Sequence, residues 1–227
     1  MIQSSSNIIM LCGTVAEEAV FSHEVFGESF YTFKMEIKRL SGQKDILPVM
    51  VSERLMTGKE IKQGKRFSIT GQLRSYNIIT DNKSKLQLQT FVREITEDET
   101  NEDTNAIVID GYICKPPVYR VTPFSREIAD ILIAVNRAYG KSDYIPSICW
   151  GRNARYCREL EVGSGIHVEG RLQSREYQKK IDEDNVISKI AYEVSVSKLA
   201  VDKKEDAGIA KDNTECEDNE NKDFDMT

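Results

Sequence analysis

The 227-residue sequence contains no run of about 18 apolar residues, the length that a membrane-spanning helix needs. Its first residues, Met1–Ser6, lack the basic segment and the long apolar segment of a secretion signal. The hydrophobic content of 40% is too high for a wholly disordered chain, and the sequence shows no collagen or coiled-coil repeat. We therefore expect a folded, soluble, cytoplasmic protein with no membrane partner and with one large core or two small ones.

Residues suited to covalent or metal chemistry are scarce. The five cysteines are odd in number and never form a C-x-x-C pair, which disfavours a disulfide framework and a zinc site. The two histidines, His23 and His167, have no Asp, Ser or Cys partners at the spacing of a catalytic or metal site. No phosphate-binding glycine loop, H-E-x-x-H or G-x-S-x-G motif is present. We predict that the protein is not an enzyme and has no catalytic residues, no metal and no other cofactor.

A net positive charge, the usual mark of a nucleic-acid partner, is also missing, since 31 basic and 37 acidic residues give −6. The acidity is unevenly distributed along the chain. Residues 1–98 carry 13 basic and 12 acidic groups, and residues 105–201 carry 14 and 12, whereas residues 99–104 carry 3 acidic groups and residues 202–227 carry 4 basic and 10 acidic ones. The negative charge therefore belongs to two short segments, and the rest of the chain remains compatible with an anionic partner.

One unit of sequence occurs twice in the chain. Asn7–Val15 aligns with Asn105–Ile113 at an offset of 98 residues. The same offset, or one residue more, aligns five further sets of residues: Arg39 with Arg137, Asp45 with Asp143, Pro48 with Pro146, Gly71–Leu73 with Gly170–Leu172, and Ser75 with Ser174. Matches spread along the whole unit indicate a duplicated domain.

The composition predicts four segments. We place the first domain at residues 1–98 and the second at residues 105–201. Residues 99–104 are acidic and without apolar side chains, so we expect a solvated linker. Residues 202–227 have a similar composition, and we expect a disordered acidic tail there.

Apolar runs and alternating patterns predict five strands and one short helix in each unit. The first unit has predicted strands at 8–15, 30–37, 45–51, 66–73 and 86–95, with a helix at 53–62. The second has strands at 107–113, 128–135, 143–150, 165–172 and 190–199, with a helix at 153–160. Gly64 and Gly163 would end the helical stretches.

Five strands with a helix between the third and the fourth are typical of the OB-type Greek-key barrel. Gly13 and Gly111 suit the bend at which the first strand of such a barrel serves both of its halves. The predicted fold is therefore all-β, with two tandem five-stranded OB-fold barrels. A pair of ordinary antiparallel sandwiches is the alternative that the pattern leaves open.

OB barrels bind single-stranded nucleic acid where aromatic rings and basic side chains alternate on the same strands. Each ring taken alone, and Trp150 above all, is more typical of a core, but as a set with basic neighbours the rings favour binding. The candidate DNA-binding residues of the second unit are the rings Tyr139, Tyr144, Trp150 and Tyr177 and the basic residues Lys115, Arg120, Arg137, Arg152, Arg171 and Arg175. Arginine suits this task because its planar group stacks and forms two-pronged phosphate contacts.

The first unit has non-aromatic residues at the positions equivalent to those four rings. They are Ser41, Ile46, Ser52 and Ile78. The remaining DNA-binding candidates of this unit are Lys38, Arg39, Arg74 and Tyr76. Because each stacked base contributes about 1–3 kcal/mol, we expect the first unit to bind weakly by itself, through charge, or to serve mainly as a pairing surface.

The second unit carries several linked motifs. They are G-Y-I-C-K-P-P-V-Y-R-V-T-P at 111–123, I-A-V-N-R at 133–137, D-Y-I-P at 143–146, C-W-G-R-N-A at 149–154 and V-E-G-R-L-Q-S-R-E-Y at 168–177. In these motifs the unit resembles the bacterial single-stranded DNA-binding protein family. The resemblance covers residues 105 to about 200, and the first unit shares it mainly through its likeness to the second.

The resemblance implies an OB fold and sequence-tolerant binding and protection of single-stranded DNA in replication, recombination or repair, within the nucleoid. It assigns base stacking to Tyr139, Tyr144, Trp150 and Tyr177. The family generally assembles four OB domains, which implies a homodimer for a two-domain chain. An alternative function is that of a primosome or mobile-element accessory protein whose OB domains mainly contact proteins.

The family also ends in an acidic tail whose tip recruits replication and repair proteins. The corresponding tip here is Asp223, Phe224, Asp225 and Met226, without the proline that precedes phenylalanine in the family. We keep these four residues as a candidate partner-binding tail, with a solubilising tail as the alternative.

Overall fold

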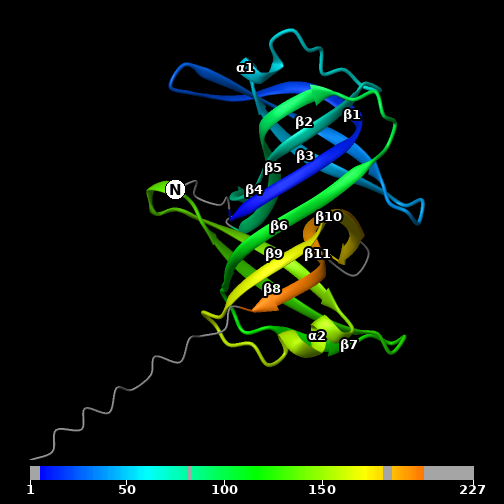
Figure 1. The fold of residues 1–227 in the computed structure, drawn as a ribbon, viewed down its shortest axis with the longest axis vertical. Helices are drawn as coiled ribbons and strands as arrows, with labels where there is room; N and C mark the ends of the chain where they lie inside the picture. Colours follow the sequence, from blue (N-terminus) through cyan, green and yellow to red (C-terminus); the bar gives the residue numbers. More distant parts are fainter. Residues whose placement is uncertain (1–5, 81–82, 181–185, 202–227) are drawn as a thin grey trace, which may run out of the picture.

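The computed structural model describes residues 6–80, 83–180 and 186–201. The elements of the first half, in chain order, are β1 (Asn7–Val25), β2 (Glu28–Lys38), β3 (Lys44–Ser52), α1 (Glu53–Met56), β4 (Arg66–Thr80) and β5 (Lys83–Glu97). Those of the second half are β6 (Thr104–Ile113), β7 (Val118–Val121), β8 (Glu127–Asn136), η1 (Ala138–Gly140), β9 (Ser142–Trp150), α2 (Arg152–Cys157), β10 (Gly165–Lys180) and β11 (Val186–Val201). Figure 1 shows the two halves one above the other.

The strand pairings close a five-stranded ring in each half. In the first half the ring runs β1–β2–β3–β5–β4 and returns to β1. In the second half it runs β6–β8–β9–β11–β10 and returns to β6. The only parallel pairs in the described residues are β3–β5 and β9–β11. This order is that of the OB-type barrel, which confirms the predicted fold class.

Alternation along the strands places apolar side chains inside the rings. Leu11, Met35 and Phe67 are fully buried in the first half, and Ile109 and Ile133 are fully buried in the second. Each of these residues has exposed or partly exposed neighbours along its strand. The period of two thus buries one face of each strand and leaves the other face available for binding.

The two rings are joined edge to edge by β1 and β6, which are equivalent strands of the two units. They pair antiparallel over six residues, from Asn7 opposite Ile109 to Cys12 opposite Thr104. This pairing makes one 11-stranded sheet of the two halves, and Figure 1 shows both strands at the centre of the molecule. An antiparallel pair of equivalent strands relates the two halves by an approximate twofold rotation.

The first strand of each unit changes its partners near the predicted glycine. β1 pairs with β4 up to Thr14 and with β2 from Thr14 onward. A Cβ atom on Gly13 would lie 2.4 Å from the carbonyl oxygen of Glu36, and one on Gly111 would lie 2.7 Å from that of Ala134. Glycine is therefore required at both positions by close backbone approach, which supports the sequence-based expectation of a bend.

Several elements differ in length from the predicted ones. β1 extends ten residues beyond the predicted end at Val15, because residues 17–25 pair with β2 in a long hairpin. β4 and β10 likewise run to residues 80 and 180 as the outer parts of hairpins. The helix predicted at 53–62 spans only Glu53–Met56, and the one predicted at 153–160 spans Arg152–Cys157. Hairpin strands far from the core lack the apolar alternation on which the prediction depends.

The composition of the acidic segment between the halves predicts a solvated linker, but the structure shows that part of this segment is held by ion pairs. The guanidinium of Arg66 contacts the carboxylates of Asp98, at 2.9 Å, and Asp103, at 2.7 Å. The backbone N–H of Lys38 also donates to Asp103, at 2.7 Å. Hydrogen bonds from Thr100, and then from Arg66, hold the pKa of Asp98 well below its usual range. Two acidic residues thus anchor the connection to the first half.

Candidate nucleic-acid interface

The outer face of β9 presents two of the four predicted rings. The odd-numbered residues of this strand are buried, whereas the side chains of Tyr144 and Trp150 are 42% and 41% exposed. Both residues have even numbers, so both point away from the barrel interior. A lone tryptophan more often lies in a protein core, but Trp150 lies on the outer face. At about 3.3 Å per residue, the two rings stand about 20 Å apart along the strand.

Tyr177 lies on β10, opposite Lys189 of β11, and the guanidinium carbon of Arg175 is 5.9 Å from the centre of its ring. The backbone of Tyr139 lies in η1, in the connection that leads from β8 to β9. The four rings thus come from β9, from β10 and from the β8–β9 connection. An OB barrel contacts a single strand through the face of its second and third strands and through the loops after its first and fourth strands; here β9 is the third strand and β10 the fourth.

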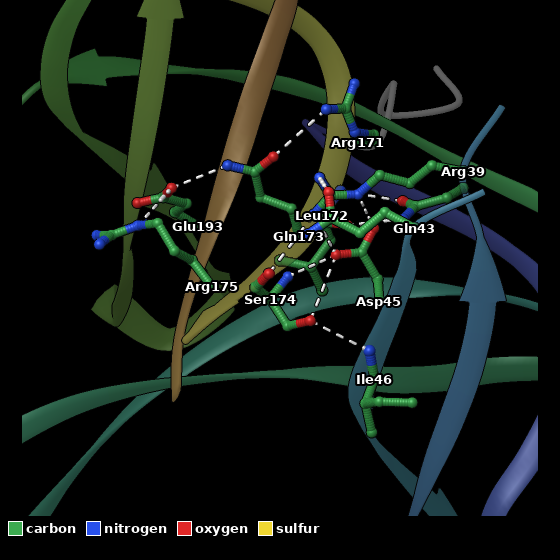
Figure 2. Close-up of polar contacts among 11 residues, drawn as sticks. Arg39, Gln43, Asp45, Ile46, Arg171, Leu172, Gln173, Ser174, Arg175 and Glu193 are labelled. Atoms are coloured by element: carbon green, nitrogen blue, oxygen red, sulfur yellow. Dashed lines mark hydrogen bonds and ion pairs between the residues drawn. The ribbon is translucent and has the colours of Figure 1, made fainter. Parts of the chain in front are cut away.

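The basic candidates of the second half differ in their surroundings. Lys115 and Arg152 are exposed. Arg120 contacts Asp130 at 2.8 Å, and Arg175 contacts Glu193 at 3.4 Å. The half-buried Arg171 donates to Gln173 at 3.4 Å, as Figure 2 shows.

Two carboxylates on this outer face were not singled out from the sequence. Asp130 lies on β8 and Glu193 on β11, and Glu193 also accepts a hydrogen bond from Gln173 at 2.9 Å. Burial raises the pKa of Asp130, while the nearby Arg120 opposes the shift. These groups partly neutralise the arginines of the second half. Only their position across neighbouring strands reveals this, since they are far from the arginines in sequence.

Two other predicted DNA-binding residues, Arg39 and Arg137, lie at the contact between the two halves. Figure 2 shows the first of these contacts, at the fully buried Asp45. Arg39 donates to its two carboxylate oxygens, at 2.7 and 2.6 Å. From the other half, the backbone N–H of Ser174 donates to Asp45 at 2.8 Å, and the Ser174 hydroxyl accepts from the backbone of Ile46 at 3.2 Å.

The second contact repeats the first with the halves exchanged. The fully buried Asp143 lies 3.1 Å from the guanidinium of Arg137 and accepts a hydrogen bond from the backbone of Ser75 at 2.6 Å. The Ser75 hydroxyl accepts from the backbone of Tyr144 at 2.8 Å. The repeated Arg, Asp and Ser positions of the sequence therefore meet across the two halves. We call the two sets the Asp45 clamp and the Asp143 clamp.

The first half holds more aromatic and basic groups than its aligned positions indicate. Arg74 and Arg93 both lie over the ring of Phe91, each with its guanidinium carbon 5.5 Å from the ring centre. Phe30 is 5.9 Å from Phe91 and stacks on His23 at 5.3 Å. Tyr76 is exposed on β4. Phe30, Phe91 and Arg93 do not occupy the positions of the family's rings, so the comparison of the two units missed them.

The remaining expectations concern groups away from this face. Within residues 6–80, 83–180 and 186–201, no cluster of three or more His, Cys, Asp or Glu side chains could hold a metal ion. The cysteines of this part are free, and the Sγ atoms of the buried Cys149 and Cys157 lie 3.4 Å apart. No helix described here is long and apolar enough to span a membrane. Lys38 is exposed at the end of β2. The candidate tail tip, residues 223–226, lies outside the described residues.

The order of the strands in each barrel, together with the exposed sheet face that carries aromatic and basic side chains, defines a class of protein. It is the class of OB-fold barrels that offer a sheet face to a ligand. Within that class, residues 104–200 match the single-strand binding protein family. The second half of the chain is therefore similar to this family.

Relatives support the assignment. Single-stranded DNA-binding protein 1 of Staphylococcus aureus strain COL is 35% identical over 83 residues, which are 34% of this chain and 50% of the relative. Single-stranded DNA-binding protein A of Bacillus subtilis is 34% identical over 83 residues, which are 34% of this chain and 48% of the relative. The chain therefore spans about half the length of these curated relatives.

Solved structures extend the likeness in fold to both halves. The wild-type single-stranded DNA binding protein from Thermus aquaticus superposes with a TM-score of 0.68 at 20% identity, covering 86% of this chain and 92% of that one. A deletion mutant of the same protein gives a TM-score of 0.69 at 19% identity. The arrangement of both halves is thus a known fold.

Proposed function

We propose that the protein binds single-stranded DNA with little sequence preference and protects it during replication, recombination or repair. One observation carries the proposal: the family match at residues 104–200 coincides with the half whose β9 exposes Tyr144 and Trp150. A base stacks on an exposed ring whatever its identity, because every base has a flat aromatic face. Binding of this kind needs neither a catalytic group nor a cofactor.

In the proposed complex, Tyr139, Tyr144, Trp150 and Tyr177 stack with bases, while Lys115, Arg120, Arg152, Arg171 and Arg175 contact phosphates. We omit Arg39 and Arg137 from the phosphate contacts of this face because buried carboxylates hold their guanidinium groups. Asp130 and Glu193 compete with phosphate for Arg120 and Arg175, so binding includes exchange of these ion pairs.

The alternative, an accessory protein that uses its barrels for protein contacts, was motivated by the lack of rings in the first half. The structure shows that Phe30 of β2 and Phe91 of β5 place two half-buried aromatic rings side by side in the first half. That motivation is therefore weaker, and DNA binding is the function that we retain.

We expect an unstructured homopolymer to quench the fluorescence of Trp150, the only tryptophan in the sequence, when it is titrated into the intact protein. The logarithm of the binding constant should fall linearly with the logarithm of salt concentration, by about 0.7 per phosphate contact. Different homopolymers should bind with similar affinity. Affinity no higher than that of an unrelated acidic protein of similar size would refute the proposal.

We further propose that residues 1–98 and 105–201 act as two domains and that two chains associate to present four barrels. The support is the closed ring in each half together with the resemblance to a family that assembles four OB domains. Mass measurement of the native protein should give twice the chain mass of 25.8 kDa, and with a single-stranded oligonucleotide it should give two chains plus the bound oligonucleotide. A mass of one chain in both conditions would contradict the dimer.

A further inference from the structure

Two adjoining hollows form a groove between the first half and the start of β9. Their volumes are about 470 and 700 Å³, and both are lined by Arg74 and Arg137. The other residues that matter here are Tyr76, Gln89, Phe91, Arg93 and Asp143. We call this surface the Phe91 groove.

Positive charge is concentrated in this groove. Its linings contain three arginines, Arg74, Arg93 and Arg137, and one carboxylate, that of Asp143, which lies 3.1 Å from Arg137 and 3.9 Å from Arg74. Burial lowers the pKa of Arg74, as do the nearby charges of Arg137 and Arg93, while Asp143 opposes the shift. Like charges held this close repel one another, and an anionic ligand would relieve the repulsion.

Phe91 lines the groove close to two of these arginines, Arg74 and Arg93, with each guanidinium carbon 5.5 Å from the ring centre. Phe91, Ser52 and Phe30 line one neighbouring hollow. Ser52 is the residue equivalent to Trp150, so Phe91 lies close to the position that Trp150 has in the second half. Phe30 pairs directly with Ser52 across β2 and β3. Rings from β2 and β5 thus occupy the place where β3 lacks one.

The two halves also differ in the acidic groups of this face. Thr32 of β2 is equivalent to Asp130 of β8, since Thr32 pairs with Met50 and Asp130 pairs with Ile148. Gln89 of β5 is equivalent to Glu193 of β11, since Gln89 pairs with Arg74 and Glu193 pairs with Gln173. The first half therefore has neutral residues, Thr32 and Gln89, where the second half has carboxylates. At these two positions the first half is the less acidic of the two, although it was expected to bind weakly.

The groove adjoins the face of the second half. Ser75 lines it, and the Ser75 hydroxyl accepts the backbone N–H of Tyr144 at 2.8 Å. A strand that stacks on Tyr144 therefore reaches the groove without leaving the protein surface.

We propose that the Phe91 groove is a second contact site for single-stranded DNA, in which Phe91 stacks with a base and Arg74 and Arg93 contact phosphates of the strand that leaves Tyr144. This inference rests on the proposed function and adds a site in the half that the family match does not cover. Flexible, negatively charged and carrying flat bases, a single strand fits both the charge and the rings of the groove.

The test uses the full chain and two oligonucleotides, one of about 10 and one of about 35 nucleotides, since one OB fold covers roughly 4–16. In the double variant Arg74→Gln, Arg93→Gln, the salt dependence for the long oligonucleotide should weaken by about 1.4 in logarithmic slope. Phe91→Leu, which keeps the apolar packing, should lower affinity for the long oligonucleotide at least about five-fold. Affinity for the short one, bound by the second half, should not change.

The matched control is Lys62→Gln, Lys65→Gln, which removes two exposed cations of the same half outside the groove. If both groove variants bind the long oligonucleotide as this control does, the groove site is refuted while the proposed function stands. If the unmodified protein binds neither oligonucleotide, both proposals fall.

Discussion

Replacement of both Tyr144 and Trp150 by alanine is expected to reduce the affinity of the protein for an unstructured oligonucleotide by about 30-fold to about 20,000-fold. The range follows from about 1–3 kcal/mol for each base that loses its stacking partner. Both rings are substantially exposed on the outer face of β9, so their removal leaves the barrel core intact. Tryptophan fluorescence is lost in this variant, and binding is therefore measured by anisotropy of a labelled oligonucleotide.

The matched control is Tyr156→Ala, because Tyr156 is an exposed tyrosine of the same half that lies on α2 rather than on β9. It should bind as the unmodified protein does. Urea unfolding of both variants separates lost contacts from lost folding. Unchanged affinity in the double variant would show that the β9 rings do not stack with bases.

Replacement of Asp45 or Asp143 by alanine is expected to lower the free energy of unfolding by about 3–5 kcal/mol each. Removing one partner of a buried ion pair leaves the other charge uncompensated, here that of Arg39 or Arg137. Each change also leaves a backbone N–H of the opposite half, at Ser174 or Ser75, without its acceptor. Since whole domains are stable by only about 5–15 kcal/mol, the double variant should be largely unfolded at room temperature.

Asp110→Ala is the control for this prediction. Asp110 also contacts a basic residue, with its carboxylate 2.6 Å from the His167 ring, but both side chains are exposed. Exposed pairs contribute about 0–1 kcal/mol, so this change should hardly move the urea midpoint. A loss below 1 kcal/mol in Asp45→Ala and Asp143→Ala would mean that the clamps do not hold the two halves together.

The residues of the clamps are visible as a repeat in the sequence, but their contacts are not. Arg39, Asp45 and Ser75 align with Arg137, Asp143 and Ser174, and this regularity was visible in the sequence. We assigned the two arginines to DNA because basic residues near rings suggest phosphate contacts. Each arginine binds the aspartate of its own copy, but the serine that completes each clamp comes from the opposite copy, so the clamps depend on how the copies pair through β1 and β6.

The candidate site divides in the same way. Tyr144 and Trp150 were predicted from their spacing and from the family motifs, because neighbours along one strand keep a fixed relation to each other. Phe91, Arg74 and Arg93 form one cluster from β4 and β5, and Phe30 joins it from β2. No local pattern connects residues that far apart in sequence.

The sequence by itself determined the duplication, the strand order, the OB-type fold and the likeness of the second half to the single-strand binding protein family. Each of these depends on local periodicity, or on motifs whose residues are close together along the chain. The tertiary structure alone decided that β1 joins β6, that Arg39 and Arg137 bind buried carboxylates, that Arg66 anchors the acidic connection and that the first half has rings of its own. Most of these features arise from contacts between distant segments, which exist only once the barrels have closed and paired. Arg39 and Arg137 are close in sequence to their carboxylates, but Ser174 and Ser75 of the opposite halves reach those carboxylates only after pairing.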